Sequence, residues 1–118
     1  MPKIITLPTY IDSRGTLTVI EKILPFEIKR AYFIENISKP RGQHKHIKTS
    51  QALICLNGSC KIEVSNNQND QVFELDDSSK CLILDPEDWH ELSNFSKGSL
   101  LLVLASHYYD KKDYLTEK

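Results

Sequence analysis

Two histidines stand two residues apart in the segment Arg41-Gly42-Gln43-His44-Lys45-His46. Successive side chains point to opposite faces of a β-strand, so a strand here would place His44 and His46 on one face and Lys45 on the other. Imidazole binds metal ions when neutral, and it exchanges protons near neutral pH. The pair therefore predicts one of two kinds of site, a metal site or an acid/base site.

Gln51 follows this pair by five residues and is out of phase with it along a strand. A bend or turn must therefore lie between His46 and Gln51 if the three side chains are to meet. The elements around these residues decide whether such a site can form.

The chain has 118 residues, of which 40% are apolar and 26% charged, as is typical of one soluble globular domain spanning residues 1–118. The net charge of -1 gives no electrostatic reason to expect nucleic acid or an anionic membrane surface as a partner. The longest apolar run, Leu100 to Ala105, is too short to span a bilayer, and Met1 to Tyr10 lacks the features of a signal peptide. We therefore expect a cytoplasmic protein.

Three cysteines, Cys55, Cys60 and Cys81, agree with a reducing compartment, because their number is odd and no pair has the C-x-x-C spacing. We expect them to be thiols that serve as small buried apolar side chains. Cys55 and Cys60 flank Asn57-Gly58, a strong signal for a hairpin turn, so they are candidates to face each other across two strands.

Short apolar runs recur between turn residues, and no long stretch has a helical period. Many short strands joined by Gly, Asn, Asp and Pro turns favour an all-β sandwich or barrel. Residues 52–56 and 59–65 are predicted to pair as a hairpin about Asn57-Gly58. The tail after Ser106 carries only a weak signal for a short helix. The predicted strands are 3–7, 16–20, 29–35, 41–46, 52–56, 59–65, 71–75, 81–84 and 99–104.

Two groups of residues resemble the two sequence motifs of the cupins, a family of jelly-roll β-barrels. The first motif of that family has an acidic residue at the position that Gln51 occupies in this chain. The resemblance implies a single jelly-roll domain. The residues that carry it are His44, His46, Gln51 and Gly58 for the first motif, and Pro86, Trp89, His90 and Asn94 for the second.

A longer ordered set of motifs is similar to the family of thymidine-diphosphate (dTDP) sugar 3,4-ketoisomerases and covers nearly the whole chain. The resemblance implies an isomerase that moves the ketone of a dTDP-linked 4-keto-6-deoxyhexose from C4 to C3, during biosynthesis of an unusual deoxysugar or amino sugar for a bacterial surface glycan. It also implies a homodimer without a cofactor or a metal. Lys45 departs from the family pattern, which has a small residue there. The matching segments are 12–15, 29–32, 40–46, 56–60, 89–91 and 104–114.

The residues support this chemistry independently. A 3,4-ketone shift removes the proton on C3, passes through an enediol and reprotonates C4. It requires a general base and acid on one side of the sugar ring and a donor for the developing oxyanion, but no redox cofactor. Two adjacent histidines with different pKa values satisfy the first requirement, because neutral imidazole accepts a proton and imidazolium donates one. We expect His44 and His46 to be this catalytic pair.

The metal interpretation is weakened at Gln51. Three histidines, His44, His46 and His90, would form a familiar non-haem metal site together with a carboxylate. A neutral amide is a poor ligand for a hard divalent ion and does not offset its charge. We therefore expect no metal, and we keep a metal-binding cupin, either an oxygenase or a small-ligand sensor, as an alternative.

Further residues complete the predicted site. Tyr32 would donate its phenol proton to a sugar oxygen, and His90 would relay protons or orient the substrate. Arg41 would pair with the diphosphate, for which a guanidinium group is well shaped. The other substrate-binding candidates are Gln51, Arg14, Arg30 and Trp89.

Two other functions stay open beside the ketoisomerase and the metal-binding cupin. A sugar-nucleotide epimerase would exchange the protons beside the ketone without moving the carbonyl. A non-catalytic sugar-binding module would bind a nucleotide sugar tightly without turnover. The sequence does not predict the configuration at C4 of the product.

Overall fold

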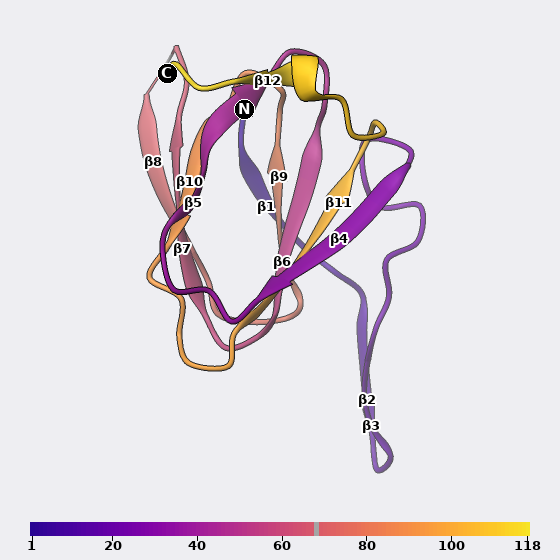
Figure 1. Cartoon of the computed structure of the whole chain (residues 1–118). Coiled ribbons are helices and arrows are strands. Elements are labelled where there is room, and N and C mark those ends of the chain that lie inside the picture. Colours follow the sequence, from indigo (N-terminus) through magenta and orange to yellow (C-terminus); the bar gives the residue numbers. More distant parts are fainter. Residues whose placement is uncertain (68) are drawn as a thin grey trace.

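The computed structural model describes residues 1–67 and 69–118, which form two facing antiparallel sheets and a projecting hairpin (Figure 1). The elements are β1 (Lys3–Thr6), β2 (Thr9–Asp12), β3 (Gly15–Thr18), β4 (Arg30–Glu35), β5 (Arg41–His46), β6 (Gln51–Asn57), β7 (Cys60–Ser65), β8 (Asp70–Leu75), β9 (Lys80–Leu84), β10 (Trp89–Ser93), β11 (Leu100–Ala105), the 3₁₀ turn η1 (Lys111–Asp113) and β12 (Tyr114–Leu115). The first sheet has the order β1-β9-β6-β11-β4, the second has β12-β5-β10-β7-β8, and β2-β3 form the hairpin. The predicted all-β class is confirmed.

Every predicted strand is present, with its ends shifted by at most two residues. β2, β10 and β12 were not predicted. β2 is exposed along its whole length, so its sequence has no alternation of buried and exposed side chains to detect. β12 has only two residues, too few for any periodic signal.

The predicted hairpin between residues 52–56 and 59–65 is wrong. β6 pairs with β9 and β11 in the first sheet, whereas β7 pairs with β8 and β10 in the second. The turn at Asn57-Gly58 does form, with Gly58 at a φ of 76°, but it leads the chain from one sheet to the other. β6 is buried from Gln51 to Cys55, and neighbours on both of its edges satisfy the hydrogen bonds of such a buried strand.

The main core lies between the two sheets. A second apolar cluster covers the outer face of the first sheet, where side chains from residues 20–26 pack on it. Cys55, Cys60 and Cys81 are buried free thiols, as predicted, and Cys55 contacts Cys60 across the core. The buried members of the main core are Leu53, Cys55, Cys60, Ile62, Val64, Leu75, Leu82, Leu84, Leu92, Leu101 and Val103.

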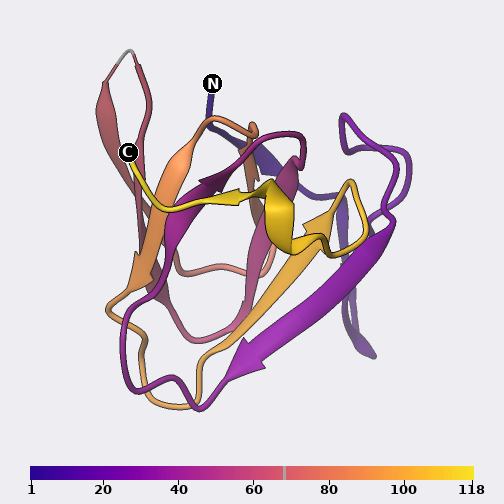
Figure 2. The same cartoon turned by 45° about the horizontal axis from the view of Figure 1, so that its top comes forward.

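The C-terminal segment crosses one end of the sandwich (Figures 1 and 2). It leaves β11 in the first sheet, turns through η1 and joins the second sheet as β12, where Tyr114 pairs with His46 and Leu115 with Lys45. The segment therefore links both sheets at the end that carries the histidines. Within the described part of the chain, no helix has the length and apolar character needed to cross a membrane.

Candidate active site

A cavity of about 180 Å³ opens between the two sheets beside the C-terminal segment. Both sheets and β12 contribute to its wall, so residues distant in sequence meet there. Its lining combines apolar side chains with several groups that can transfer protons or bind anions. The lining residues are Arg30, Tyr32, Ile34, Arg41, Gly42, His44, Gln51, Leu53, His90, Leu92, Val103 and Tyr114.

His44 is a half-buried member of this wall, on β5. Its Nδ1 lies 3.0 Å from the carbonyl oxygen of Gly42. Because a carbonyl can only accept, Nδ1 carries the proton and Nε2 keeps its lone pair. Burial lowers the pKa of His44, and the bond to Gly42 only partly opposes this. His44 is therefore a neutral imidazole, suited to act as a base.

His90 pairs with His44 across β10 and β5, and the two ring centroids are 4.9 Å apart. Its Nδ1 donates to the backbone carbonyl of Asp88 over 3.0 Å, which leaves its Nε2 as an acceptor. Only 3% of His90 is exposed, and this burial lowers its pKa to about 3. His90 is thus a second neutral imidazole at the cavity.

The close approach of β5 to β10 depends on Gly42. Its φ is +85°, a conformation that favours glycine, and a Cβ there would lie 3.0 Å from the carbonyl oxygen of His90. The next residue, Gln43, also has a positive φ, of 59°, and the register of β5 against β10 shifts at this point. This bulge sets the direction of the His44 side chain.

His46 shares a face with His44, as predicted from strand alternation, with ring centroids 5.2 Å apart. However, His46 does not line the cavity and is only 5% exposed. The ring of Tyr114 lies 4.5 Å from that of His46 and is itself part of the lining. His46 therefore lies in a second layer of the wall, and its role as the partner of His44 in the catalytic pair stays a prediction.

Tyr32 and Gln51 form the opposite wall, in the first sheet. Residues 47–50 supply the predicted bend between His46 and Gln51, and this bend leads the chain into the other sheet. Nε2 of Gln51 donates to the Tyr32 hydroxyl oxygen over 3.2 Å, so the phenol proton stays available to another acceptor. Burial raises the pKa of Tyr32, which keeps this phenol protonated.

Two guanidinium groups, Arg30 and Arg41, also line the cavity. The guanidinium of Arg30 lies 4.4 Å from the centre of the Tyr32 ring, and its Nη1 donates to the Tyr114 hydroxyl over 3.2 Å. No role was predicted for Tyr114, because only the path of the remote C-terminal segment brings it here. The two arginines give the cavity a positive charge suited to an anionic substrate.

Arg14 and Trp89 do not line this cavity, and their binding of substrate stays a prediction. Arg14 is on the projecting hairpin and pairs with Asp12 over 2.6 Å. Trp89 points to the face of β10 opposite His90, and its indole N–H donates to the carbonyl oxygen of Thr116 over 3.0 Å. Trp89 therefore anchors the C-terminal segment.

The described residues that line the cavity include no carboxylate, whereas the non-haem metal site considered above requires one beside its three histidines. Within residues 1–67 and 69–118, no three His, Cys, Asp or Glu side chains are grouped to hold a metal ion. Gln51 occupies the wall position at which a carboxylate was considered, and its amide is engaged with Tyr32.

Comparisons with known proteins identify the family of this chain. The family model described as FdtA: WxcM-like, C-terminal matches residues 1–118. The TDP-4-oxo-6-deoxy-α-D-glucose-3,4-oxoisomerase of Aneurinibacillus thermoaerophilus is 43% identical over 119 residues, covering 98% of this chain and 86% of the relative.

Solved structures agree in fold over the same length. The sugar 3,4-ketoisomerase QdtA from Thermoanaerobacterium thermosaccharolyticum, in complex with TDP, has a TM-score of 0.94 at 43% identity, covering 98% of this chain and 88% of that one. The TDP-quinovose 3,4-ketoisomerase WlaRB from Campylobacter jejuni has a TM-score of 0.94 at 39% identity, covering 98% and 92%. With its jelly-roll sandwich and its histidine-lined cavity, this chain belongs to the FdtA family of sugar 3,4-ketoisomerases.

Proposed function

We propose that this enzyme moves the ketone of a TDP-linked 4-keto-6-deoxyhexose from C4 to C3 by proton transfer through an enediol. The observation that carries the proposal is the pairing of neutral imidazoles, His44 and His90, with the protonated phenol of Tyr32 in one cavity. A mutant of the related QdtA was solved with TDP-4-keto-6-deoxyglucose, which supports this class of substrate.

His44 would act as the base. The ketone at C4 acidifies the proton on C3, and Nε2 of His44 would take that proton while its Nδ1 stays bound to Gly42. The electron pair of the C3–H bond would form the C3–C4 double bond, leaving an enediolate whose charge is on the C4 oxygen. Return of a proton from the His44 imidazolium to C4, with transfer of the C3 hydroxyl proton to the C4 oxygen, would then complete the shift without any net oxidation.

Tyr32 would stabilise the oxyanion. Its phenol keeps a free proton because Gln51 donates to its oxygen. Oε1 of Gln51 is buried and has no hydrogen-bond partner among the described residues, so it can accept from a sugar hydroxyl. His90, with its lone pair at Nε2, would orient a second hydroxyl.

Arg41 and Arg30 would bind the diphosphate. Both line the cavity, and guanidinium groups form paired hydrogen bonds to phosphate oxygens. The cavity itself is small, so the nucleoside would extend out of it along the surface. We also propose a cytoplasmic location, because the three cysteines are free thiols and a reducing compartment keeps thiols in this state. We propose in addition that the product is used for a surface glycan.

Incubation with TDP-4-keto-6-deoxyglucose tests this function. We expect ¹³C NMR to follow the carbonyl from C4 to C3, before and after dialysis of the enzyme against a chelator, since the chemistry requires no metal. Binding without a change in the carbonyl would instead indicate a sugar-binding module. Loss of activity on chelation, with recovery on adding a transition metal, would favour a metal-dependent cupin.

We further propose that the enzyme is a homodimer joined through the β2-β3 hairpin. Figure 1 shows this hairpin extending away from the two sheets. Tyr10, Ile11 and Leu17 are 62%, 78% and 63% exposed on it, and such apolar exposure on a projecting arm favours burial against a second copy. Arg14 lies at its tip and would contact substrate only through the dimer.

Replacing Leu17 with Ser should therefore shift the protein from dimer toward monomer, measured by sedimentation equilibrium across protein concentrations. Val72 is equally exposed, at 63%, but lies on β8, the edge strand of the second sheet, away from the hairpin. Val72→Ser is thus a matched control that should leave the dimer intact. A monomeric wild-type protein, or equal effects of both substitutions, would reject the hairpin interface.

A further inference from the structure

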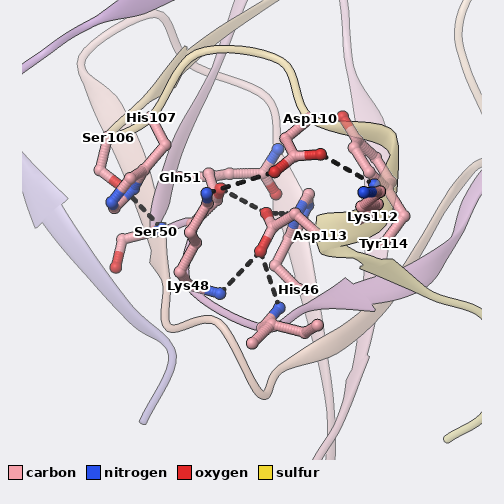
Figure 3. A network of polar contacts seen from close by, with 12 residues as sticks. His46, Lys48, Ser50, Gln51, Ser106, His107, Asp110, Lys112, Asp113 and Tyr114 are labelled. Carbon is pink, nitrogen blue, oxygen red and sulfur yellow. Dashed lines mark hydrogen bonds and ion pairs between the residues drawn. The ribbon is translucent and has the colours of Figure 1, made fainter.

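A buried hydrogen bond to a carboxylate joins His46 to the C-terminal segment (Figure 3). Nδ1 of His46 lies 2.9 Å from Oδ2 of Asp113, a residue of η1 that is 3% exposed. The same carboxylate accepts from Thr49 Oγ1 over 2.5 Å and from the backbone N–H groups of Ile47 and Lys48 over 3.1 and 2.8 Å. Four donors thus hold one carboxylate in a fixed position behind the cavity wall.

These contacts define the tautomer of His46. Burial opposes ionisation of Asp113, but the hydrogen bonds from Thr49, Lys48 and His46 outweigh it and lower its pKa to about 2. An ionised carboxylate can only accept, so the proton of neutral His46 must be on Nδ1. Its Nε2 then has a buried lone pair with no hydrogen-bond partner among the described residues.

His46 differs from the other two histidines in its partner. Nδ1 of His44 and Nδ1 of His90 each donate to a neutral backbone carbonyl, whereas Nδ1 of His46 donates to a full negative charge. The His46 ring centroid is 5.2 Å from that of His44 and 6.3 Å from that of His90. The full negative charge of Asp113, 2.9 Å from His46, favours a positively charged imidazolium among these three histidines more than a carbonyl dipole does.

We infer that Asp113 is a positioning residue that fixes His46 as its Nδ1–H tautomer and stabilises the positive charge that the histidine cluster gains when it takes the sugar proton. Asp113 does not line the cavity and acts only through His46. The part of this inference that concerns the reaction rests on the proposed function. The assignment of the tautomer does not, because it depends only on the contacts within the protein.

Replacing Asp113 with Asn separates position from charge. The amide oxygen can still accept from the N–H groups of Ile47 and Lys48, while the NH₂ group would face His46 Nδ1 and Thr49 Oγ1. Both of those atoms can accept, so we expect His46 to change to the Nε2–H tautomer. We expect kcat to fall by about 100-fold, with KM changed by less than about threefold, because the substrate site keeps its lining.

Long-range ¹H–¹⁵N NMR on histidine-labelled protein measures the tautomer directly, with His46→Gln to assign the signals. Asp110→Asn is the matched control, since Asp110 caps η1 and pairs with Lys48 at the surface, and it should change neither the tautomer nor kcat. A proton on Nε2 in the wild-type protein overturns the inference even if Asp113→Asn does not fold. A kcat equal to that of Asp110→Asn overturns it as well. Wild-type protein with the Nδ1–H tautomer but no isomerisation would reject the proposed function alone.

Discussion

His44→Asn should abolish the ketone shift while the protein stays folded. Asparagine is small and polar, and it can occupy the position of the imidazole, but it cannot accept a proton near neutral pH. His44 is the only one of the three histidines that both lines the cavity and remains partly exposed to it. General base catalysis contributes about 10²- to 10⁴-fold, so we expect kcat to fall by about 10³-fold or more.

His107→Asn is the control for this substitution. His107 lies beside Ser106, whose hydroxyl is 2.7 Å from its Nδ1, and it does not line the cavity. Its replacement should leave kcat unchanged, while thermal melts followed by circular dichroism show that both variants are folded. Full activity in His44→Asn, or equal losses in both variants, would remove His44 from its role as base.

Acidification should destabilise the fold between about pH 6.5 and about pH 3, mainly through His90. Burial lowers the pKa of His90 from 6.5 to about 3 in the folded protein. Within this window the unfolded chain binds a proton that the folded protein lacks. The free energy of unfolding therefore rises with pH and decreases as the pH falls. Burial also lowers the pKa values of His44 and His46, so these two residues add to the same dependence of stability on pH. The expected loss is of the order of a few kcal/mol.

Urea unfolding at a series of pH values from 7.5 to 4.5 measures this effect. Above pH 4.5 the contribution of Asp113 to the free energy of unfolding is nearly constant. Its pKa is about 2 in the folded protein and 3.8 in the unfolded chain, so both values are below this range. His90→Gln should flatten the dependence on pH whatever its effect on absolute stability. The same slope in wild type and His90→Gln would show that His90 is not buried in its neutral form.

The local features of the site could be predicted from the sequence. Strand alternation placed His44 and His46 on one face, and the phase of Gln51 required the bend that residues 47–50 form. Each of these inferences uses neighbours within a few residues, for which the strand geometry is fixed by the backbone. The resemblance to the ketoisomerases supplied Tyr32, which the structure brings opposite His44.

The depth of each residue could not be predicted in the same way. Alternation assigns a face but does not say which element covers it, so it could not show that Tyr114 packs against His46 and lines the cavity in front of it. Asp113 and Tyr114 reach the histidines only because the C-terminal segment crosses between the sheets, a contact over more than 60 residues of sequence. The hydrogen bond from the Trp89 indole to this segment could not be predicted for the same reason.

The turn at Asn57-Gly58 illustrates a further limit. Its residues correctly predicted a sharp turn, and Gly58 is required there because a Cβ would lie 2.4 Å from Ser96 Oγ. A turn signal, however, does not specify whether the two strands pair with each other or enter different sheets. The partners of β6 and β7 come from β9, β11, β8 and β10, and no local pattern encodes this choice.

Isotope incorporation in heavy water tests most directly whether the ketone moves through an enediol that takes up a solvent-exchangeable proton at C4. TDP-4-keto-6-deoxyglucose incubated with the enzyme in D₂O should give a product with its carbonyl at C3 and deuterium on C4, detected together by ¹³C and ²H NMR. Deuterium at C3 with the carbonyl still at C4 would contradict the ketone shift and would identify the enzyme as an epimerase.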